Sequence, residues 1–188
     1  MRAVVCLAGG IASGKTTVAQ ALVKMWPNAS MRSFGDVVRR HVRAAGLSVE
    51  RATLQDTGLR LIAEGWAAFV DELVVDLPPD ADVLIVDGIR HVEAIEELRR
   101  RFPEVPVRLI YLRADEASVR ERLGVRGESR EMLGHQVESS LEAVERAADE
   151  VIEASQPVEE IMRSMTVGLV RSGTIGRRRA RPFATSPS

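Results

Sequence analysis

The segment that most constrains the fold is a glycine-rich octapeptide at residues 9–16. Its sequence, GGIASGKT, fits the pattern G-x-x-x-x-G-K-[ST] at every position. Glycines let the backbone turn tightly, so that its N–H groups point at phosphate oxygens, and a helix N-terminus attracts the same anion. In this pattern Lys15 contacts the β- and γ-phosphates of ATP, and the hydroxyl of Thr16 ligates Mg²⁺. The octapeptide therefore predicts a phosphate-binding loop (P-loop).

The flanking sequence supports this interpretation. An apolar run at residues 3–8 precedes the loop, and Val18, Leu22 and Met25 follow it at helical spacing. With glycine at about 7% of residues, a chance match is on the order of 1%, so an accidental glycine-rich turn is the weaker alternative. We expect the nucleotide to contact Gly9, Gly10, Ala12, Ser13, Gly14, Lys15, Thr16 and Thr17.

The remaining apolar runs predict a parallel α/β fold. Four further candidate strands lie at residues 29–34, 83–86, 107–112 and 150–154. Amphipathic segments lie between them, including one long helix marked by Leu54, Leu61, Ile62, Phe69 and Leu73. Strands that alternate with helices indicate a three-layer α/β/α sandwich around a five-stranded parallel sheet. We expect one domain over residues 1–170.

Composition excludes several classes of protein. The net charge is -1 over 188 residues, so no overall field recruits nucleic acid or a membrane. Cys6 is the only cysteine, and the three histidines lack metal-ligand spacing. The apolar run at residues 3–12 is too short for a signal peptide, and we expect a cytoplasmic location. Residues 171–188 carry five arginines and no acid, and we expect a disordered tail there.

A second candidate ligand for the metal is Asp87. It ends the apolar run at residues 83–86, and ligands in parallel sheets bind at the carboxyl ends of strands. An aspartate on a neighbouring strand often holds the Mg²⁺ of a P-loop protein. The alternative is an ordinary Asp-Gly turn with Gly88. We favour the metal ligand, and we expect Arg90 to face the same cleft.

Several segments resemble nucleoside and nucleotide kinases of the P-loop superfamily. Residues 9–19 look like the opening of dephospho-CoA kinases, and residues 147–152 resemble a motif near the end of those enzymes. Residues 33–39 are similar to the second-strand motif of adenylate kinases, and residues 51–62 to the acceptor helices of phage-type deoxynucleotide kinases. Residues 87–90 look like the Asp-Gly-x-Pro-Arg of nucleoside monophosphate kinases, but are one residue shorter and lack the proline.

The resemblance implies roles on the acceptor side. Arg39 and Arg90 would bind the acceptor's phosphate or the transferring group, because guanidinium grips phosphate oxygens in pairs. Asp36 would orient an acceptor hydroxyl and take its proton, whereas a phosphate acceptor needs no base. Gln55 would read an acceptor base. The alternatives are that Asp36 caps a helix, that Arg39 pairs with Asp36, and that Gln55 is a solvated helix residue.

An arginine-dense segment at residues 120–133 is similar to the lid of nucleotide kinases. Arg122 and Arg126 flank Gly124, which matches the spacing of lid arginines. Such a lid excludes water and adds positive charge around the moving phosphoryl group. We expect Arg122 to bind ATP and Arg126 to act in catalysis beside Lys15, Asp36 and Arg90. The alternative is a helix with a solvated, charged face.

Together these features predict a kinase that uses Mg²⁺ and ATP on a small-molecule acceptor. The acceptor is a nucleotide, a nucleoside or a CoA precursor, which leaves dephospho-CoA kinase proper as an alternative. A P-loop ATPase or a nucleotide-binding regulatory protein is the alternative from another class. A monomer and a homodimer are both compatible with the sequence.

Overall fold

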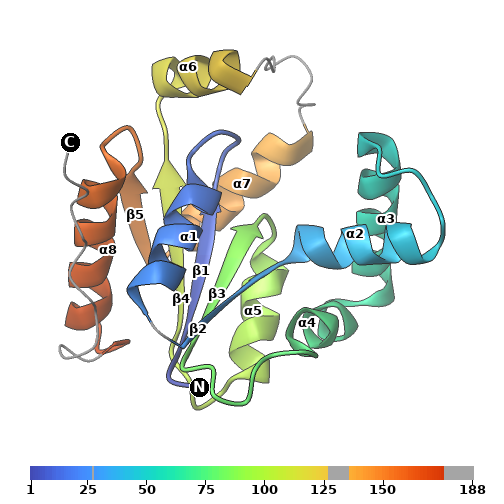
Figure 1. The fold of residues 1–188 in the computed structure, drawn as a ribbon, viewed down its shortest axis with the longest axis horizontal. Helices are drawn as coiled ribbons and strands as arrows, with labels where there is room; N and C mark the ends of the chain where they lie inside the picture. Colours follow the sequence, from blue (N-terminus) through green and yellow to red (C-terminus); the bar gives the residue numbers. More distant parts are fainter. Residues whose placement is uncertain (27, 127–135, 176–188) are drawn as a thin grey trace.

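The computed structural model describes residues 1–26, 28–126 and 136–175, and a parallel β-sheet lies at its centre (Figure 1). The strands follow the spatial order β2-β3-β1-β4-β5, and each pairs with its neighbours in parallel. They are β1 (Ala3–Gly9), β2 (Ala29–Ser33), β3 (Val83–Ile89), β4 (Val107–Arg113) and β5 (Glu150–Glu153). The predicted five-stranded parallel sheet is confirmed.

Helices cover both faces of the sheet and complete the three-layer sandwich. They are α1 (Lys15–Met25), α2 (Phe34–Ala44), α3 (Arg51–Glu64), α4 (Trp66–Val74), α5 (Val92–Arg101), α6 (Glu116–Arg126), α7 (Gln136–Arg146) and α8 (Val158–Arg171). Helices α1 and α8 pack on one face, and α4, α5 and α7 on the other. Figure 1 shows α2 and α3 beside the β2 edge, and α6 above the carboxyl ends of the strands.

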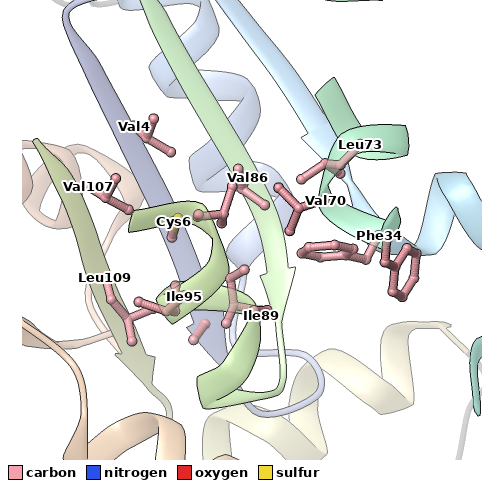
Figure 2. Close-up of a cluster of buried hydrophobic side chains, with 14 of the residues drawn as sticks. Val4, Cys6, Phe34, Val70, Leu73, Val86, Ile89, Ile95, Val107 and Leu109 are labelled. Atoms are coloured by element: carbon pink, nitrogen blue, oxygen red, sulfur yellow. The ribbon is translucent and has the colours of Figure 1, made fainter. Parts of the chain in front are cut away.

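Alternate residues of the central strands enter two separate apolar cores. Val4 and Cys6 of β1 face the α5 side, where Figure 2 shows them with Val86 and Leu109 of the flanking strands. Val5 and Leu7 face α1 and α8. Because β1 is buried on both faces, its sequence is continuously apolar instead of alternating. A fully buried Leu or Val contributes about 1.5–3 kcal/mol, so this strand is held firmly under the loop that follows it.

The long helix predicted between residues 54 and 73 is wrong, because the chain breaks it into α3 and α4 at Gly65. Gly65 has φ 119° and ψ 144°, a backbone conformation that residues with a Cβ rarely adopt. The turn brings Trp66 against Phe34 and Phe69, at ring-centroid distances of 5.9 and 5.8 Å. The helical spacing of apolar residues continues through the glycine, so periodicity alone does not reveal the break.

Two other boundaries differ from the sequence-based expectation. Strand β3 continues past Val86 to Ile89, with Gly88 (φ 82°) at an irregularity in its pairing with β1. At the other end of the chain, Thr174 is 4% exposed and Ile175 packs against the α8 core. Arg171 therefore ends α8, and Thr174 and Ile175 pack with the domain, so the expectation of a disordered tail is wrong for residues 171–175. Residues 176–188 of the expected tail lie outside the described residues. No helix in the described ranges is long and apolar enough to cross a membrane.

Candidate active site

The loop between β1 and α1 owes its shape to two glycines. Gly9 has φ 143°, and a Cβ there would lie 2.4 Å from the carbonyl oxygen of Leu112 on β4. Gly14 has φ 88° and directly precedes α1. Between them Ala12 adopts φ 53°, the only left-handed residue other than glycine among those described. The motif glycines are thus required by backbone geometry, as the sequence predicts.

Lys15 lies folded over this loop. Its Nζ donates hydrogen bonds to the carbonyl oxygens of Gly9 at 2.9 Å and Gly10 at 2.6 Å, and to Oγ of Ser13 at 3.2 Å. The ammonium group is therefore held above the turn, at the N-terminus of α1, where the helix dipole is positive. The helix end and the lysine place positive charge at one point, which suits the terminal phosphates of a nucleotide.

Thr16 and Asp87 meet beside the loop, although 71 residues separate them in the sequence. Oγ1 of Thr16 donates to Oδ2 of Asp87 at 2.8 Å. The register of the sheet explains the contact, because Asp87 pairs with Leu7 of β1 near the carboxyl edge. Asp87 is 8% exposed, and its Oδ1 has no hydrogen-bond partner among the described residues. Buried polar atoms are nearly always satisfied, so this oxygen points to a missing ligand.

The donor set fits Mg²⁺. A hydroxyl and a carboxylate are hard oxygen ligands, and Mg²⁺ commonly takes one or two protein oxygens and completes its shell with water and phosphate. No cluster of three or more His, Cys, Asp or Glu side chains suited to a metal occurs in the described part of the chain. An ion held here would therefore depend on the nucleotide for its remaining ligands.

Asp36 and Arg39 lie together in the first turns of α2, exposed to solvent. Nη2 of Arg39 donates to Oδ1 of Asp36 at 2.7 Å, and Nε to the same atom at 3.2 Å. The two side chains are 60% and 40% exposed. The N-cap of α2 is Ser33, so the alternative that Asp36 caps the helix is wrong, whereas the alternative that Arg39 pairs with Asp36 is present in the structure. An exposed pair of this kind contributes about 0–1 kcal/mol, so an acceptor could displace it at little cost.

Arg90 follows β3, Arg51 begins α3, and the two charges are close enough to act on one another. The pKa of Arg90 is lowered, first by burial and then by the positive charge of Arg51, while Asp87 acts in the opposite direction. Neither guanidinium donates a hydrogen bond to any described residue, nor does either form an ion pair there. These two guanidinium groups repel one another and pair with no acid among the described residues, an arrangement that favours the binding of an anion between them.

Sequence reasoning missed Arg51. One signal was available, since Arg51 is the first residue of α3, where the helix dipole disfavours positive charge. Gln55 lies one turn further along the same helix face and is exposed. Its position is compatible with reading an acceptor and with an ordinary surface role.

Arg122 of α6 reaches back to the P-loop. Its Nη1 donates to the carbonyl oxygen of Ala12 at 3.0 Å, and its Nη2 to that of Ala154 at 2.6 Å. Arg122 therefore lies beside the nucleotide loop with its hydrogen bonds made to backbone carbonyls, and its contact with ATP stays a prediction. The side chain of Arg126 and residues 127–133 of the expected lid lie outside the described residues.

A pocket of about 380 Å³ opens between the P-loop, α6 and α8. Gly14 and Thr17 line it from the loop side, Val125 from α6, and Gln156 and Val158 from the segment after β5. It combines apolar residues with the charged Glu121 and Arg122 and the amide of Gln156, a mixture typical of small-molecule sites. The sequence contained no signal for Val125, Gln156 or Val158, because their meeting depends on how three distant segments pack.

A polar bridge fixes two walls of this pocket. Asp115, just before α6, accepts hydrogen bonds from the backbone N–H of Ser118 at 2.8 Å and from the hydroxyl of Ser155. These bonds lower the pKa of Asp115 to about 2, mainly through the Ser118 amide and then the Ser155 hydroxyl. The start of α6 is thereby attached to the loop after β5.

This architecture defines a class of protein. A parallel sheet ordered β2-β3-β1-β4-β5, with a glycine-rich loop joining its central strand to a helix, is the fold of P-loop kinases. At the level of family, the AAA domain (AAA_18) matches residues 5–153, and the chain belongs to that family.

Relatives and solved structures agree with this classification. A UPF0200 protein of Thermococcus kodakarensis is 26% identical over 129 residues, which is 66% of this chain and 68% of the relative. One from Pyrococcus abyssi is 25% identical over 130 residues, 67% and 68% of the two chains.

Among solved structures, the tunicamycin resistance protein of Deinococcus radiodurans has a TM-score of 0.59 at 18% identity, covering 93% of this chain and 98% of the other. Shikimate kinase from Acinetobacter baumannii has a TM-score of 0.57 at 15% identity, with 93% and 96% covered. A gluconokinase from Sinorhizobium meliloti has 0.52 at 17%, with 92% and 95% covered. At these identities the likeness establishes a shared fold.

Proposed function

We propose that this protein transfers the γ-phosphate of Mg²⁺-ATP to a small-molecule acceptor of nucleotide or nucleoside type. One observation carries the proposal. The glycine-rich loop and the Thr16–Asp87 hydrogen bond lie at the carboxyl edge of the sheet, and Arg90 directly follows β3 at that edge. The charge of Arg51 acts on Arg90, and neither guanidinium is paired among the described residues. A loop that only bound nucleotide would not need the further positive charges of Arg51 and Arg90.

On the donor side, the backbone N–H groups of residues 9–16 and the ammonium of Lys15 bind the β- and γ-phosphates. The adenine ring occupies the pocket between Thr17, Val125 and Val158, with the amide of Gln156 at its edge. Thr16 and Asp87 hold Mg²⁺, which neutralises charge on the β- and γ-phosphate oxygens when it is bound. Because these groups are fixed before the reaction, they stabilise the transition state without reorganising.

On the acceptor side, Arg51 and Arg90 bind an anionic part of the acceptor. Asp36 orients a hydroxyl and takes its proton after exchanging Arg39 for the acceptor, whereas a phosphate acceptor needs no base. Gln55 contributes a hydrogen bond from α3. Most of the catalysis is then positioning plus neutralisation of charge, and little covalent work falls to the protein.

The remaining sequence-based assignments belong to the same proposal. The kinase domain predicted at residues 1–170 extends to Ile175, and a lid at about 120–133 closes over ATP with Arg126 near the transferring group. Dephospho-CoA is retained as a specific acceptor because of the resemblance at residues 9–19 and 147–152. The AAA domain description of the family keeps an ATPase or a nucleotide-binding regulatory protein as the alternative from another class.

An acceptor panel with γ-labelled ATP tests the proposal. The panel contains deoxynucleotides, nucleosides and dephospho-CoA, together with shikimate and gluconate because of the neighbouring folds. We expect label to appear on one chemical class of acceptor, and this transfer to require Mg²⁺. Label released only as free phosphate with every acceptor would instead identify an ATPase. No release at all, with ATP bound, would identify a binding protein.

A further inference from the structure

The guanidinium group of Arg122 joins three segments that are far apart in the sequence. It lies on α6, donates to the carbonyl of Ala12 in the P-loop, and donates to the carbonyl of Ala154 after β5. The sequence separations are 110 and 32 residues. A planar guanidinium presents separate nitrogens to the two carbonyls in a fixed geometry, whereas an ammonium offers a single nitrogen with rotatable donors.

The bond to Ala12 determines how one peptide unit of the loop is oriented. A peptide group is planar, so the carbonyl of Ala12 and the N–H of Ser13 point in opposite directions. Arg122 holds the carbonyl, and the Ser13 N–H is directed to the carbonyl of Gly10 at 3.4 Å, inside the turn. Ala12 has φ 53°, which a residue with a Cβ keeps only when its surroundings enforce it. Arg122 provides such a constraint.

The second bond fixes Arg122 to a rigid part of the molecule. Ala154 is fully buried, and its own N–H donates to the carbonyl of Arg113 at the end of β4. The next residue, Ser155, bonds to Asp115 at the start of α6. The loop after β5, which accepts the bond from Arg122, is therefore attached to the sheet through Arg113 and to the start of α6 through Asp115.

We propose that Arg122 is a positioning residue for the donor site, which fixes the orientation of the Ala12–Ser13 peptide in the P-loop before any nucleotide arrives. The effect of Arg122 on ATP binding rests on the proposed function, whereas its effect on the loop does not. The competing interpretation, in which Arg122 acts only by direct contact with nucleotide phosphates, leaves the empty loop independent of this side chain.

Backbone ¹⁵N relaxation of the ligand-free protein separates these two interpretations. In the wild type we expect order parameters of about 0.85 for residues 12–14, and in Arg122→Ala values below about 0.6 for the same amides. Calorimetry should show Mg²⁺-ATP binding weakened by roughly tenfold in that variant, because binding must then order the loop. Arg100→Ala is the control, since Arg100 lies on α5, away from the loop, with its side chain 65% exposed. It should leave both quantities unchanged.

Arg122→Lys tests charge against geometry. It keeps the positive charge but replaces two fixed nitrogens by a single one on a flexible stem, so we expect the loop to be more mobile and ATP affinity to be lower than in the wild type. Two results would overturn the proposal. One is wild-type affinity for Mg²⁺-ATP in Arg122→Lys although its loop is mobile. The other is a loop in Arg122→Ala that is as rigid as in the wild type. A wild type that binds no ATP would refute the proposed function, while the relaxation data would still decide the role of Arg122.

Discussion

The two sides of the candidate active site are built in different ways. On the donor side, Lys15, Thr16 and Arg122 already bond to backbone or side-chain atoms around them. On the acceptor side, Arg51 and Arg90 have no hydrogen-bond acceptor in the described ranges, and Asp36 and Arg39 form an exposed pair. The donor side is mainly backbone held by a buried sheet, and the acceptor side consists of side chains from three separate elements.

The difference separates recognition of the triphosphate, by the loop backbone, from recognition of the acceptor, by side chains. A triphosphate presents the same oxygens in every reaction, so a rigid backbone turn can be complementary to it in advance. Side chains at the start of α2, the start of α3 and the end of β3 can change without disturbing the core, which allows acceptors to differ between relatives. We therefore expect donor-side substitutions to remove activity, and acceptor-side substitutions to weaken mainly acceptor binding.

The largest expected effect is that of Lys15→Ala. Removing the ammonium above the loop should lower turnover by at least about 100-fold, the scale for loss of one transition-state charge contact. Steady-state kinetics with saturating acceptor would measure it. Lys24→Ala is the control, because it removes the chain's other lysine, which lies in the last turn of α1. Turnover near that of the wild type in Lys15→Ala would mean that the loop does not bind phosphates.

Asp87→Asn should separate activity from stability. Loss of the carboxylate should raise the Mg²⁺ concentration needed for activity by roughly tenfold or more, because one anionic ligand of the ion disappears. It should not lower the melting temperature, because it removes a buried charge with one unpartnered oxygen. Each 1 kcal/mol gained in the free energy of unfolding should raise the melting temperature by about 2–4 °C. Differential scanning calorimetry without metal measures this, and a clear loss of stability would show that Asp87 is structural.

Arg90→Ala should affect the acceptor side alone. Charged hydrogen bonds contribute about 1.5–3 kcal/mol, so the KM for the acceptor should rise by roughly 10- to 100-fold while the KM for ATP changes little. Arg51→Ala should behave in the same way. Arg39→Ala should have the smallest effect of the three, because its present partner is an exposed carboxylate. Equal changes in both KM values would break the division into donor and acceptor sides.

The smallest expected effect is a pH dependence of the free energy of unfolding, caused by the Asp115–Ser155 bridge at the donor pocket. The folded pKa of Asp115, about 2, is below its ordinary value of 3.8, so its contribution to stability is present above pH 4 and is lost as pH falls through 2. Urea unfolding of the wild type and Asp115→Asn should therefore differ more at pH 6 than near pH 2. A difference that does not depend on pH would mean that the carboxylate's charge plays no part in this bridge.

The same division explains what the sequence could predict. Residues 9–16 are local in the chain, and the apolar run before Asp87 places that residue at the carboxyl edge, so the fold and the Thr16–Asp87 meeting point are accessible from pattern alone. The break at Gly65 was missed because apolar spacing continues across it. Arg51, Val125 and Gln156 were missed because their proximity to the site depends on the packing of distant segments, which leaves no periodic signal.

The central claim is that residues 9–16, with Lys15, bind a triphosphate at the top of the buried sheet. Isothermal titration calorimetry of the wild type and Lys15→Ala with ATP, in the presence and absence of Mg²⁺, tests it most directly. We predict one binding site in the wild type, with a Kd between about 1 μM and 1 mM, strengthened by Mg²⁺ and lost in the variant. Absence of heat in the wild type, or equal binding by the two proteins, would contradict the account.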